Sequence, residues 1–259
     1  MKILRNKINL KKEILDIKGL AFIPTMGALH YGHVKMIKFA KNKFKKIIVS
    51  IFVNPKQFNS KHDFKSYPRN IEKDIKLLKR LKVDFLYLPS YIDIFSFKTK
   101  KKVYLHSFSK KLCGKYRKGH FEGVLGVINQ LLKVIKAKYI FLGEKDYQQL
   151  YLIKKFLSKK FNVRINSCPT IRSKNKIALS TRNNLLNKKA IKKASLIAKL
   201  LNSAKLRSKL GLSKFNLDLH DFKQKLEKKF DIKIDYLEFR DEKSLKLSKL
   251  KNKFRLFIA

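Results

Sequence analysis

Two histidines and a glycine, His30, Gly32 and His33, stand close together in the stretch FIPTMGALHYGH at residues 22–33. Imidazole rings beside the start of a helix can donate hydrogen bonds to phosphate oxygens while negative charge builds on a leaving pyrophosphate. A glycine between them lets a nucleotide approach the backbone closely. The alternative is that these are two ordinary loop histidines and a turn glycine, and the surrounding elements decide between the two interpretations.

The stretch lies at a predicted turn from a strand into a helix. The apolar run LAFIP at residues 20–24 predicts a buried strand, and HVKMIKFAK at residues 33–41 begins a helix. We expect this turn to aim backbone N–H groups and a helix N-terminus at one spot, where a phosphate would bind. Neither the dinucleotide fingerprint G-x-G-x-x-G nor the P-loop pattern is present. The position of the turn favours the functional interpretation of the His-x-Gly-His pattern.

Short apolar runs alternate with helical patterns in the first two thirds of the chain. The runs IIVSIFV, VDFLYL and YIFLG occupy residues 47–53, 83–88 and 139–143. Between them, apolar residues recur with helical spacing in residues 71–81 and 124–135. Continuous apolar strands separated by amphipathic helices are typical of a parallel sheet covered on both faces. Residues 1–171 are therefore predicted to form a Rossmann-like, doubly wound α/β domain.

The remaining residues, 172–259, predict a smaller α+β domain at the C-terminus. A pattern rich in Lys, Ala and Leu predicts a helix from Asn187 to Leu210, and HDFKQKLEKKF predicts a second helix at residues 220–230. Two strands, IKIDYLEF and FRLFIA, are predicted at residues 232–239 and 254–259.

The charge is strongly positive, with 64 lysines and arginines against 18 acidic residues and a formal net charge of +46. Such a balance is typical of nucleic-acid-binding proteins. Only 10 of the 64 basic residues are Arg, however, and Arg is preferred for bidentate contacts with phosphates and base edges. The lysines are spread along the whole chain with excess Ile, Asn and Phe, which favours compositional drift over a selected nucleic-acid surface. A basic RNA-binding protein stays the less favoured alternative.

Two cysteines, Cys113 and Cys168, lie 55 positions apart without a C-x-x-C pattern or a Cys/His cluster. They suggest neither a disulfide framework nor a zinc site, and a reducing cytoplasm fits best. No window approaches 18 consecutive apolar residues, and the N-terminal residues lack the apolar region of a secretion signal. We expect a cytoplasmic protein without a membrane span.

Six motifs, in the same order along the chain, closely resemble those of the pantothenate synthetase (pantoate–beta-alanine ligase) family. They are PTMGALHYGH, VSIFVNPKQFN, YPRNIEKDIKLL, GHFEGV, FLGEKDYQQL and ALSTRN. The match runs from about residue 20 to residue 186, with a weaker continuation to the end. The resemblance implies a nucleotidyltransferase-superfamily enzyme that uses ATP and Mg²⁺ to activate (R)-pantoate as pantoyl adenylate, releasing pyrophosphate. The amine of β-alanine would then attack the adenylate to give pantothenate and AMP.

The resemblance also implies roles for individual residues. ATP would contact the turn made of Met26, Gly27, Ala28, Leu29, His30, Tyr31, Gly32 and His33, the segment Gly143, Glu144, Lys145 and Asp146, and the group Ile171, Leu179, Ser180, Thr181 and Arg182. His33 as proton donor, with His30 and Lys145, would act in catalysis. Gln57 and Gln149 would bind pantoate, and Gln57 would also bind β-alanine. Family positions near the substrates, where packing explains the residues equally well, are Tyr67, Arg69, Arg117 and His120. The metal ligands stay unassigned.

The resemblance further implies a homodimer whose first domain binds ATP and pantoate and whose second domain closes over the triphosphate. A plain adenylyltransferase of the same superfamily, acting on a phosphate ester, stays an alternative, although such an enzyme is not expected to carry both NPKQF and EKDYQQL. Apart from the motifs, Gln57 and Gln149 can be read as surface amides, and Asp146 as the cap of the helix that follows it.

Two departures from the family pattern concern the site and the second domain. Cys113 stands where the family commonly has a Glu that organises a loop by the active site, so the order of this loop and the dimer contacts are in doubt. The chain stops at Ala259, soon after its last predicted strand, where family members typically continue. We therefore expect a shortened second domain that closes less firmly over ATP.

Overall fold

The structure is a computed structural model, and it describes residues 1–95, 107–209, 218–248 and 253–259. Internal contacts divide the chain into two compact units. The first unit comprises Met1–Arg172 and Ala178–Asn184, and the second comprises Ser173–Ile177 and Leu185–Ala259. The assignment of a substrate domain and a lid domain, with a boundary at residue 171, stays a prediction.

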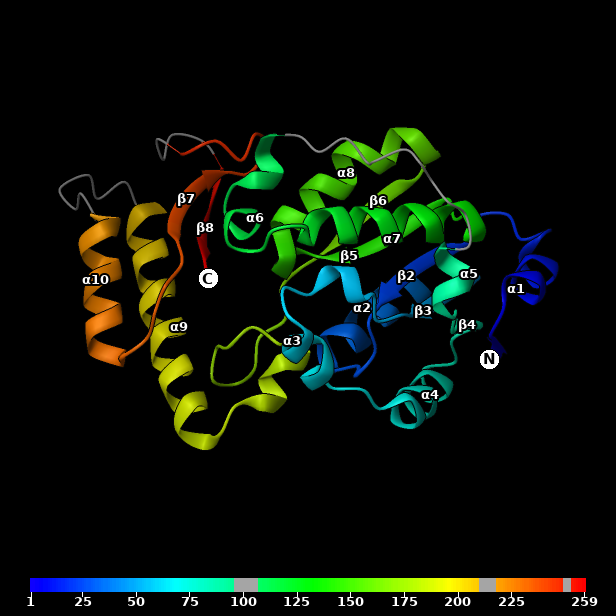
Figure 1. Ribbon diagram of the computed structural model, residues 1–259, viewed down its shortest axis with the longest axis horizontal. Helices are drawn as coiled ribbons and strands as arrows, with labels where there is room; N and C mark the ends of the chain where they lie inside the picture. The colour runs from blue at the N-terminus through cyan, green and yellow to red at the C-terminus, as the bar shows by residue number, and fades with distance from the viewer. Residues whose placement is uncertain (96–106, 210–217, 249–252) are drawn as a thin grey trace. The chain divides into compact units, whose positions relative to one another are not determined.

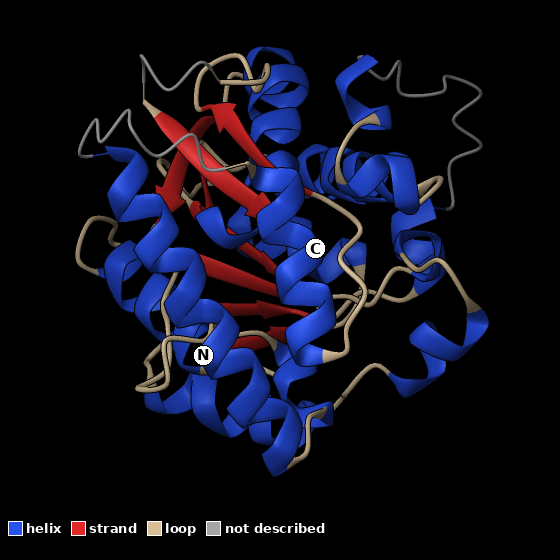
Figure 2. Cartoon of the chain, turned by 90° about the vertical axis from the view of Figure 1, so that its left-hand side faces the viewer, coloured by secondary structure: helices blue, strands red, loops and turns tan. Residues whose placement is uncertain are grey.

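Six parallel strands form the sheet of the first unit, in the spatial order β1-β4-β3-β2-β5-β6. The strands are β1 Lys2–Leu4, β2 Ala21–Thr25, β3 Ile47–Ile51, β4 Phe85–Tyr87, β5 Tyr139–Gly143 and β6 Arg164–Cys168. Figure 2 shows the strands as red arrows among blue helices. The predicted α/β fold is confirmed.

Helices cover both faces of this sheet (Figure 1). The described helices of the first unit are α1 Lys7–Ile14, α2 Tyr31–Lys41, α3 Lys61–Ser66, α4 Ile71–Arg80, α5 Tyr91–Phe95, α6 Cys113–Tyr116, α7 His120–Ile135 and α8 Tyr147–Phe161. The described residues also form the short 3₁₀ turns η1 Pro55–Gln57, η2 Ser107–Lys110, η3 Glu144–Asp146 and η4 Thr181–Leu185. Successive strand residues point to opposite faces, so Phe22 packs in the core beneath α7 and α8 while Ile23 packs in the core beneath α2 and α4.

Two strands at the edges of the sheet lack the apolar runs that predict the central strands. β1 is only three residues long, and β6, with the sequence RINSC, is mostly polar. Each pairs with a single neighbouring strand. Because an edge strand is less enclosed than a central one, its sequence needs no continuous apolar run.

The second unit has its own small core. Its elements are α9 Lys188–Lys209, α10 Leu219–Phe230, and the antiparallel pair β7 Leu237–Asp241 and β8 Phe254–Ile258. Leu226 and Phe230 of α10 pack with Leu237 of β7 in this core. The predicted end of α9 at Leu210 lies outside the described residues.

The prediction of a strand that begins at residue 232 is wrong, because β7 begins at Leu237. The preceding segment hydrogen-bonds elsewhere. Ile234 N–H donates to the Glu227 side chain at 2.7 Å, and Asp235 N–H donates to the carbonyl of Ala259 at 2.7 Å. Within the ranges that the structure describes, no helix combines the length and apolarity needed to cross a membrane.

Candidate active site

Three loops meet at the carboxyl edge of the sheet, where the order of the strands reverses. β2 pairs with β3 on one side and with β5 on the other, although β5 follows much later in the chain. In open α/β sheets, ligands bind outside the carboxyl ends of the strands at such a switch point. The loops after β2, β3 and β5 carry the His-x-Gly-His pattern, Gln57 and Lys145, so the topology brings these motifs together.

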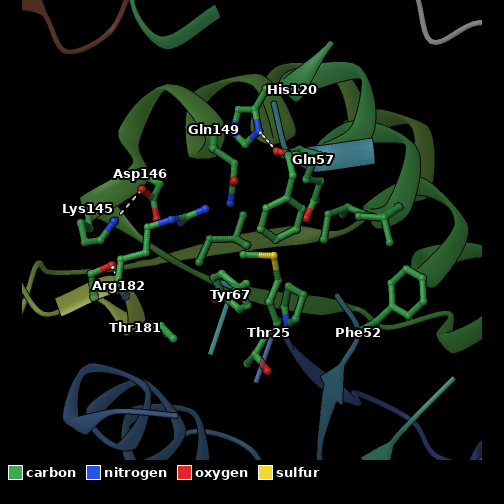
Figure 3. A pocket seen from close by; sticks show the side chains of 18 of the residues that line it. Thr25, Phe52, Gln57, Tyr67, His120, Lys145, Asp146, Gln149, Thr181 and Arg182 are labelled. Atoms are coloured by element: carbon green, nitrogen blue, oxygen red, sulfur yellow. Dashed lines mark hydrogen bonds and ion pairs between the residues drawn. The ribbon is translucent and has the colours of Figure 1, made fainter. Parts of the chain in front are cut away.

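A pocket at this edge is lined by residues of the first unit (Figure 3). The predicted site residues that line it are Met26, His30, His33, Gln57, Lys145, Asp146, Gln149, Ser180, Thr181 and Arg182. Those that do not line it are Gly27, Ala28, Leu29, Tyr31, Gly32, Gly143, Glu144, Ile171 and Leu179. Of the four further family positions, Tyr67, Arg117 and His120 line the pocket, whereas Arg69 instead donates hydrogen bonds to nearby backbone carbonyls.

His30 and His33 are fixed by reciprocal hydrogen bonds at the start of α2. His30 Nδ1 accepts from Gly32 N–H at 3.1 Å, and His33 Nδ1 accepts from His30 N–H at 3.2 Å. Because each Nδ1 is an acceptor, a neutral ring carries its proton on Nε2. Burial lowers the pKa of both rings, to about 3 for His33. At neutral pH both side chains are therefore uncharged rings that donate through Nε2.

The imidazole ring of His30 occupies the space next to Gly32. A β-carbon at Gly32 would lie 2.8 Å from Cε1 of His30, closer than real β-carbons approach. The absence of a side chain at Gly32 therefore makes room for the imidazole that its own N–H binds. This is a different use of the glycine from the close approach of a nucleotide that the sequence suggests.

The backbone N–H groups of the turn are largely used inside the chain. Gly27 N–H donates to Thr25 Oγ1 at 3.2 Å, and the N–H groups of Ala28 and Leu29 donate to the Asp74 carboxylate, both at 2.8 Å. Two more N–H groups bind the imidazoles described above. The expectation that the turn aims its N–H groups at a phosphate is wrong for these five donors, because side chains already satisfy them. The rings of His30 and His33 line the pocket, and neither Nε2 has a hydrogen-bond partner among the described residues.

Gln57 reaches the pocket from η1, which packs tightly against α7. A β-carbon at Gly123 of α7 would stand 2.3 Å from the carbonyl oxygen of Lys56, so only glycine fits there. Asn54 Nδ2 also donates to the carbonyl of Gly123 at 3.0 Å. Gln57 itself is 9% exposed, so the interpretation of this residue as a surface amide is wrong.

Arg117 and His120 hold the backbone of Gln57. Arg117 Nη2 donates to the Gln57 carbonyl at 3.0 Å, and His120 Nδ1 donates to the same oxygen at 2.8 Å (Figure 3). Burial, and then the charge of Arg117, lower the pKa of His120 to about 4. His120 is thus neutral, with its proton on Nδ1, and its Nε2 accepts from Arg117 Nη1 at 3.2 Å. Both residues line the pocket and fix one wall of it.

Two neighbouring amides of α8 lie in different surroundings. Gln149 is half-buried and lines the pocket, so the surface-amide interpretation is wrong for this residue as well (Figure 3). Gln148 is buried, and its Nε2 donates to the carbonyls of Phe108 and Lys111 at 3.0 and 2.7 Å. Its Oε1 accepts from Cys113 N–H at 3.1 Å. The Gln148 amide therefore ties down the backbone of the segment that contains Cys113.

Arg182 lines the pocket beside a carboxylate and two aromatic rings. Its Nε and Nη2 donate to the Asp63 carboxylate at 3.1–3.3 Å. The rings of Tyr67 and Phe58 have their centroids 5.2 and 5.8 Å from the guanidinium carbon. Among the described residues, Nη1 has no hydrogen-bond partner. One edge of the guanidinium is thus held by the protein, and the other edge can bind an anion.

Lys145 and Asp146 form an ion pair in the loop after β5. Lys145 Nζ lies 2.8 Å from Asp146 Oδ1, and both side chains are accessible at the pocket (Figure 3). Asp146 occupies the position before α8 without making a side-chain capping hydrogen bond. Asp146 is therefore the N-cap residue of α8 by position, but its side chain does not cap the helix.

Several residues that build the pocket are not among the site residues predicted from the sequence. Its apolar wall includes Phe52, Val124, Val127, Ile128 and Leu131. Helical spacing predicts that the α7 members are buried, but it does not say that they face a ligand. Asp74 does carry a signal, because it lies three residues after Ile71 and four before Leu78, on the predicted apolar face of its helix.

Comparisons with known proteins match this architecture and these motifs. A family model described as Pantoate-beta-alanine ligase matches residues 2–259. A pantothenate synthetase of Flavobacterium psychrophilum is 36% identical over 259 residues, covering 98% of this chain and 91% of that protein. A bifunctional pantoate ligase/cytidylate kinase of Prochlorococcus marinus is 41% identical over 250 residues, and the match covers 94% of this chain and 48% of the length of that protein.

Solved structures give the same result. A pantoate-beta-alanine ligase from Francisella tularensis, complexed with beta-gamma ATP and beta-alanine, has a TM-score of 0.83 and 32% identity, covering 100% of this chain and 97% of that chain. A pantothenate synthetase from Thermus thermophilus has a TM-score of 0.83 and 28% identity, covering 96% of this chain and 90% of that chain. The chain therefore belongs to the pantoate-beta-alanine ligase family of ATP-dependent ligases.

Proposed function

We propose that this chain condenses (R)-pantoate with β-alanine to pantothenate, using ATP and passing through a pantoyl adenylate. The observation that carries the proposal is the composition of one pocket. Three neutral imidazoles, two amides and three cationic side chains line it together with an apolar wall. This set suits a reaction between a hydroxy acid and a nucleoside triphosphate, and membership of the family supports the choice of pantoate.

In the first step, a carboxylate oxygen of pantoate attacks the α-phosphorus of ATP. A new O–P bond forms, the bond to the β-phosphate oxygen breaks, and pyrophosphate leaves. Negative charge builds on the α-phosphate and the leaving group, so fixed donors stabilise the transition state. The Nε2 groups of His30 and His33, the ammonium of Lys145 and the open edge of Arg182 would supply these donors.

Pantoate would bind between the two amides and the apolar wall. Gln57 and Gln149 can bind its hydroxyl and carboxylate groups without an ion pair that would weaken the carboxylate as a nucleophile. The dimethyl carbon of pantoate would pack against apolar side chains of α7, among them Val124 and Ile128. The pocket thus offers polar contacts to one side of the acid and apolar contacts to the other.

In the second step, the amine of β-alanine attacks the acyl carbon of the adenylate. A C–N bond forms, the C–O bond to AMP breaks, and the amine loses a proton to solvent. Gln57 would also contact this substrate. Holding the amine and the adenylate in one pocket converts a reaction between two molecules into an internal one.

Mg²⁺ is implied as the metal that accompanies ATP. Within the described ranges, no three His, Cys, Asp or Glu side chains form a ready metal site. Mg²⁺ usually binds through one or two carboxylates and substrate phosphates. Asp146, with an accessible carboxylate at the pocket, would hold the ion together with the triphosphate. The ion would neutralise part of the phosphate charge.

Product analysis tests the proposal. Incubation with ATP, Mg²⁺, pantoate and β-alanine should give pantothenate, AMP and pyrophosphate in equal amounts. Without β-alanine, about one pyrophosphate per active site should appear in a single burst. A folded protein that forms no pantothenate would refute the proposal, and adenylylation of a phosphate ester instead would identify a plain adenylyltransferase. A homodimer in the cytoplasm stays a prediction, and sedimentation would test the dimer.

A further inference from the structure

A buried carboxylate lies beneath the turn that carries the histidines. Asp74, in the first turns of α4, is 3% exposed. Its Oδ2 accepts from Ala28 N–H and its Oδ1 accepts from Leu29 N–H, both at 2.8 Å. The two N–H groups are separated from Asp74 by 46 and 45 positions in the sequence. A single side chain thus binds two consecutive backbone donors of the turn.

The backbone that Asp74 binds has an unusual conformation. Ala28 has φ +47°, in the left-handed region that residues with side chains rarely adopt. The conformation persists because the surroundings hold it on both sides. Asp74 binds the N–H of Ala28, and Thr181 Oγ1 donates to the carbonyl of Ala28 at 3.2 Å. Without these contacts, Ala28 would relax toward a negative φ and move the residues on either side.

The charge of Asp74 has no cationic partner in the described part of the chain. Burial raises the pKa of its carboxyl group, whereas the two backbone hydrogen bonds lower it. Its neighbour on the same helix face, Leu78, is buried and apolar. An apolar side chain at residue 74 could fill this buried position as well, so packing does not explain the carboxylate. The carboxylate is therefore matched to the two N–H groups that it binds.

We infer that Asp74 is a positioning residue for ATP. It holds the turn in the conformation that brings Met26, His30 and His33 to the pocket, although Asp74 itself does not line the pocket. The inference rests on the proposed function in one respect only, namely that the pocket binds ATP. Helix α4 thereby supports the nucleotide site from outside the pocket. We also expect the contribution of Asp74 to ATP binding to depend on the strained φ of Ala28.

Binding of a non-hydrolysable ATP analogue, measured by calorimetry with Mg²⁺ present, tests the inference without requiring turnover. Asp74→Asn replaces one acceptor oxygen by an NH₂ group that faces a backbone N–H, so the dissociation constant should rise about tenfold or more. Glu72→Gln is the matched control, because Glu72 is exposed in the same turn of α4 and the change also removes one negative charge. The control should bind the analogue within about twofold of the wild type.

A double substitution separates positioning from a general loss of structure. Glycine adopts positive φ freely, so Asp74→Asn should weaken analogue binding clearly less in an Ala28→Gly background than in the wild-type background. A merely structural role of Asp74 predicts the same ratio in both backgrounds, and that result would overturn the inference. So would a folded Asp74→Asn variant that binds within twofold of the wild type. If the wild type binds the analogue but makes no pantothenate, only the proposed function fails; if it does not bind, both fail.

Discussion

The backbone of Gly123 in α7 lies directly against the carbonyl of Lys56, the residue before Gln57. A β-carbon at Gly123 would stand 2.3 Å from that oxygen and 3.0 Å from the backbone nitrogen of Gln57. The helix and the 3₁₀ turn η1 are therefore in contact at backbone level. Any side chain at Gly123 must move η1, and η1 carries an amide that we assign to pantoate and β-alanine.

The substitution Gly123→Ala tests this contact. We expect it to reduce the free energy of unfolding by about 1–3 kcal/mol, as overpacking does, and to lower kcat/KM for pantoate by tenfold or more because Gln57 shifts. Gly126→Ala is the matched control on the same helix, since a β-carbon there meets no atom within 4 Å. The control should stabilise the helix by about 0.5–1 kcal/mol. Equal effects of the two substitutions would contradict the assignment.

Gln148 and Gln149 give a second matched pair. Gln148→Ala removes hydrogen bonds from two carbonyls and one N–H of the segment before α7, so we expect a loss of about 1–3 kcal/mol in unfolding free energy. Gln149→Ala should raise KM for pantoate or lower kcat while the melting temperature hardly changes. Chemical denaturation and steady-state kinetics on both variants distinguish these outcomes. Unchanged kinetics of the Gln149→Ala variant would show that Gln149 does not contribute to pantoate binding.

His33 is expected to act mainly on the adenylation step. His33→Ala removes the Nε2 donor and should slow pyrophosphate release by about 10²-fold or more, as the loss of an oxyanion-type donor does. His62→Ala is the control, because His62 is exposed on α3. The rate is measured in a single turnover with pantoate and ATP and without β-alanine. Pyrophosphate release at the wild-type rate would show that His33 has another role.

The neutral histidines of the pocket make stability depend on pH. In the unfolded chain, each ring binds a proton near its ordinary pKa of about 6.5. In the fold, burial lowers the pKa to about 3 for His33 and about 4 for His120. The unfolded state therefore binds more protons below that ordinary pKa, and the free energy of unfolding falls as the pH drops from about 7 to about 5.

Replacing one of these rings tests the pH dependence. His120→Gln should make the decrease in the free energy of unfolding between about pH 7 and pH 5 shallower, because the unfolded chain then has one histidine fewer to protonate. His62→Gln, at an exposed position, should leave the slope as in the wild type. Urea denaturation at several pH values measures the slopes. Parallel curves for the wild type and His120→Gln would contradict the buried, neutral state of His120.

The fold and the histidine turn could be predicted because their signals are local in the sequence. The central strands are continuous apolar runs, and the His-x-Gly-His pattern stands directly after one of them. The edge strand β6 has no such run, since it is less enclosed and its residues are mostly polar. Local patterns thus identify the covered interior of the sheet better than its borders.

The hydrogen-bond partners of the turn could not be predicted in the same way. The contact of Asp74 with Ala28 joins residues 46 positions apart, and no spacing rule within one segment reports it. The sequence pattern therefore suggested free backbone donors where the fold supplies a carboxylate. An acidic residue on the apolar face of a predicted helix is the signal that points to such a contact.

Transfer of an isotope from pantoate tests the central claim most directly. Pantoate labelled with ¹⁸O in both carboxylate oxygens is incubated with the enzyme, ATP, Mg²⁺ and β-alanine, and the products are analysed by mass spectrometry. If the carboxylate attacks the α-phosphorus and the amine then displaces AMP, each AMP carries one ¹⁸O and pyrophosphate carries none. Unlabelled AMP, or formation of ADP with the label in inorganic phosphate, would contradict a pantoyl adenylate in this pocket.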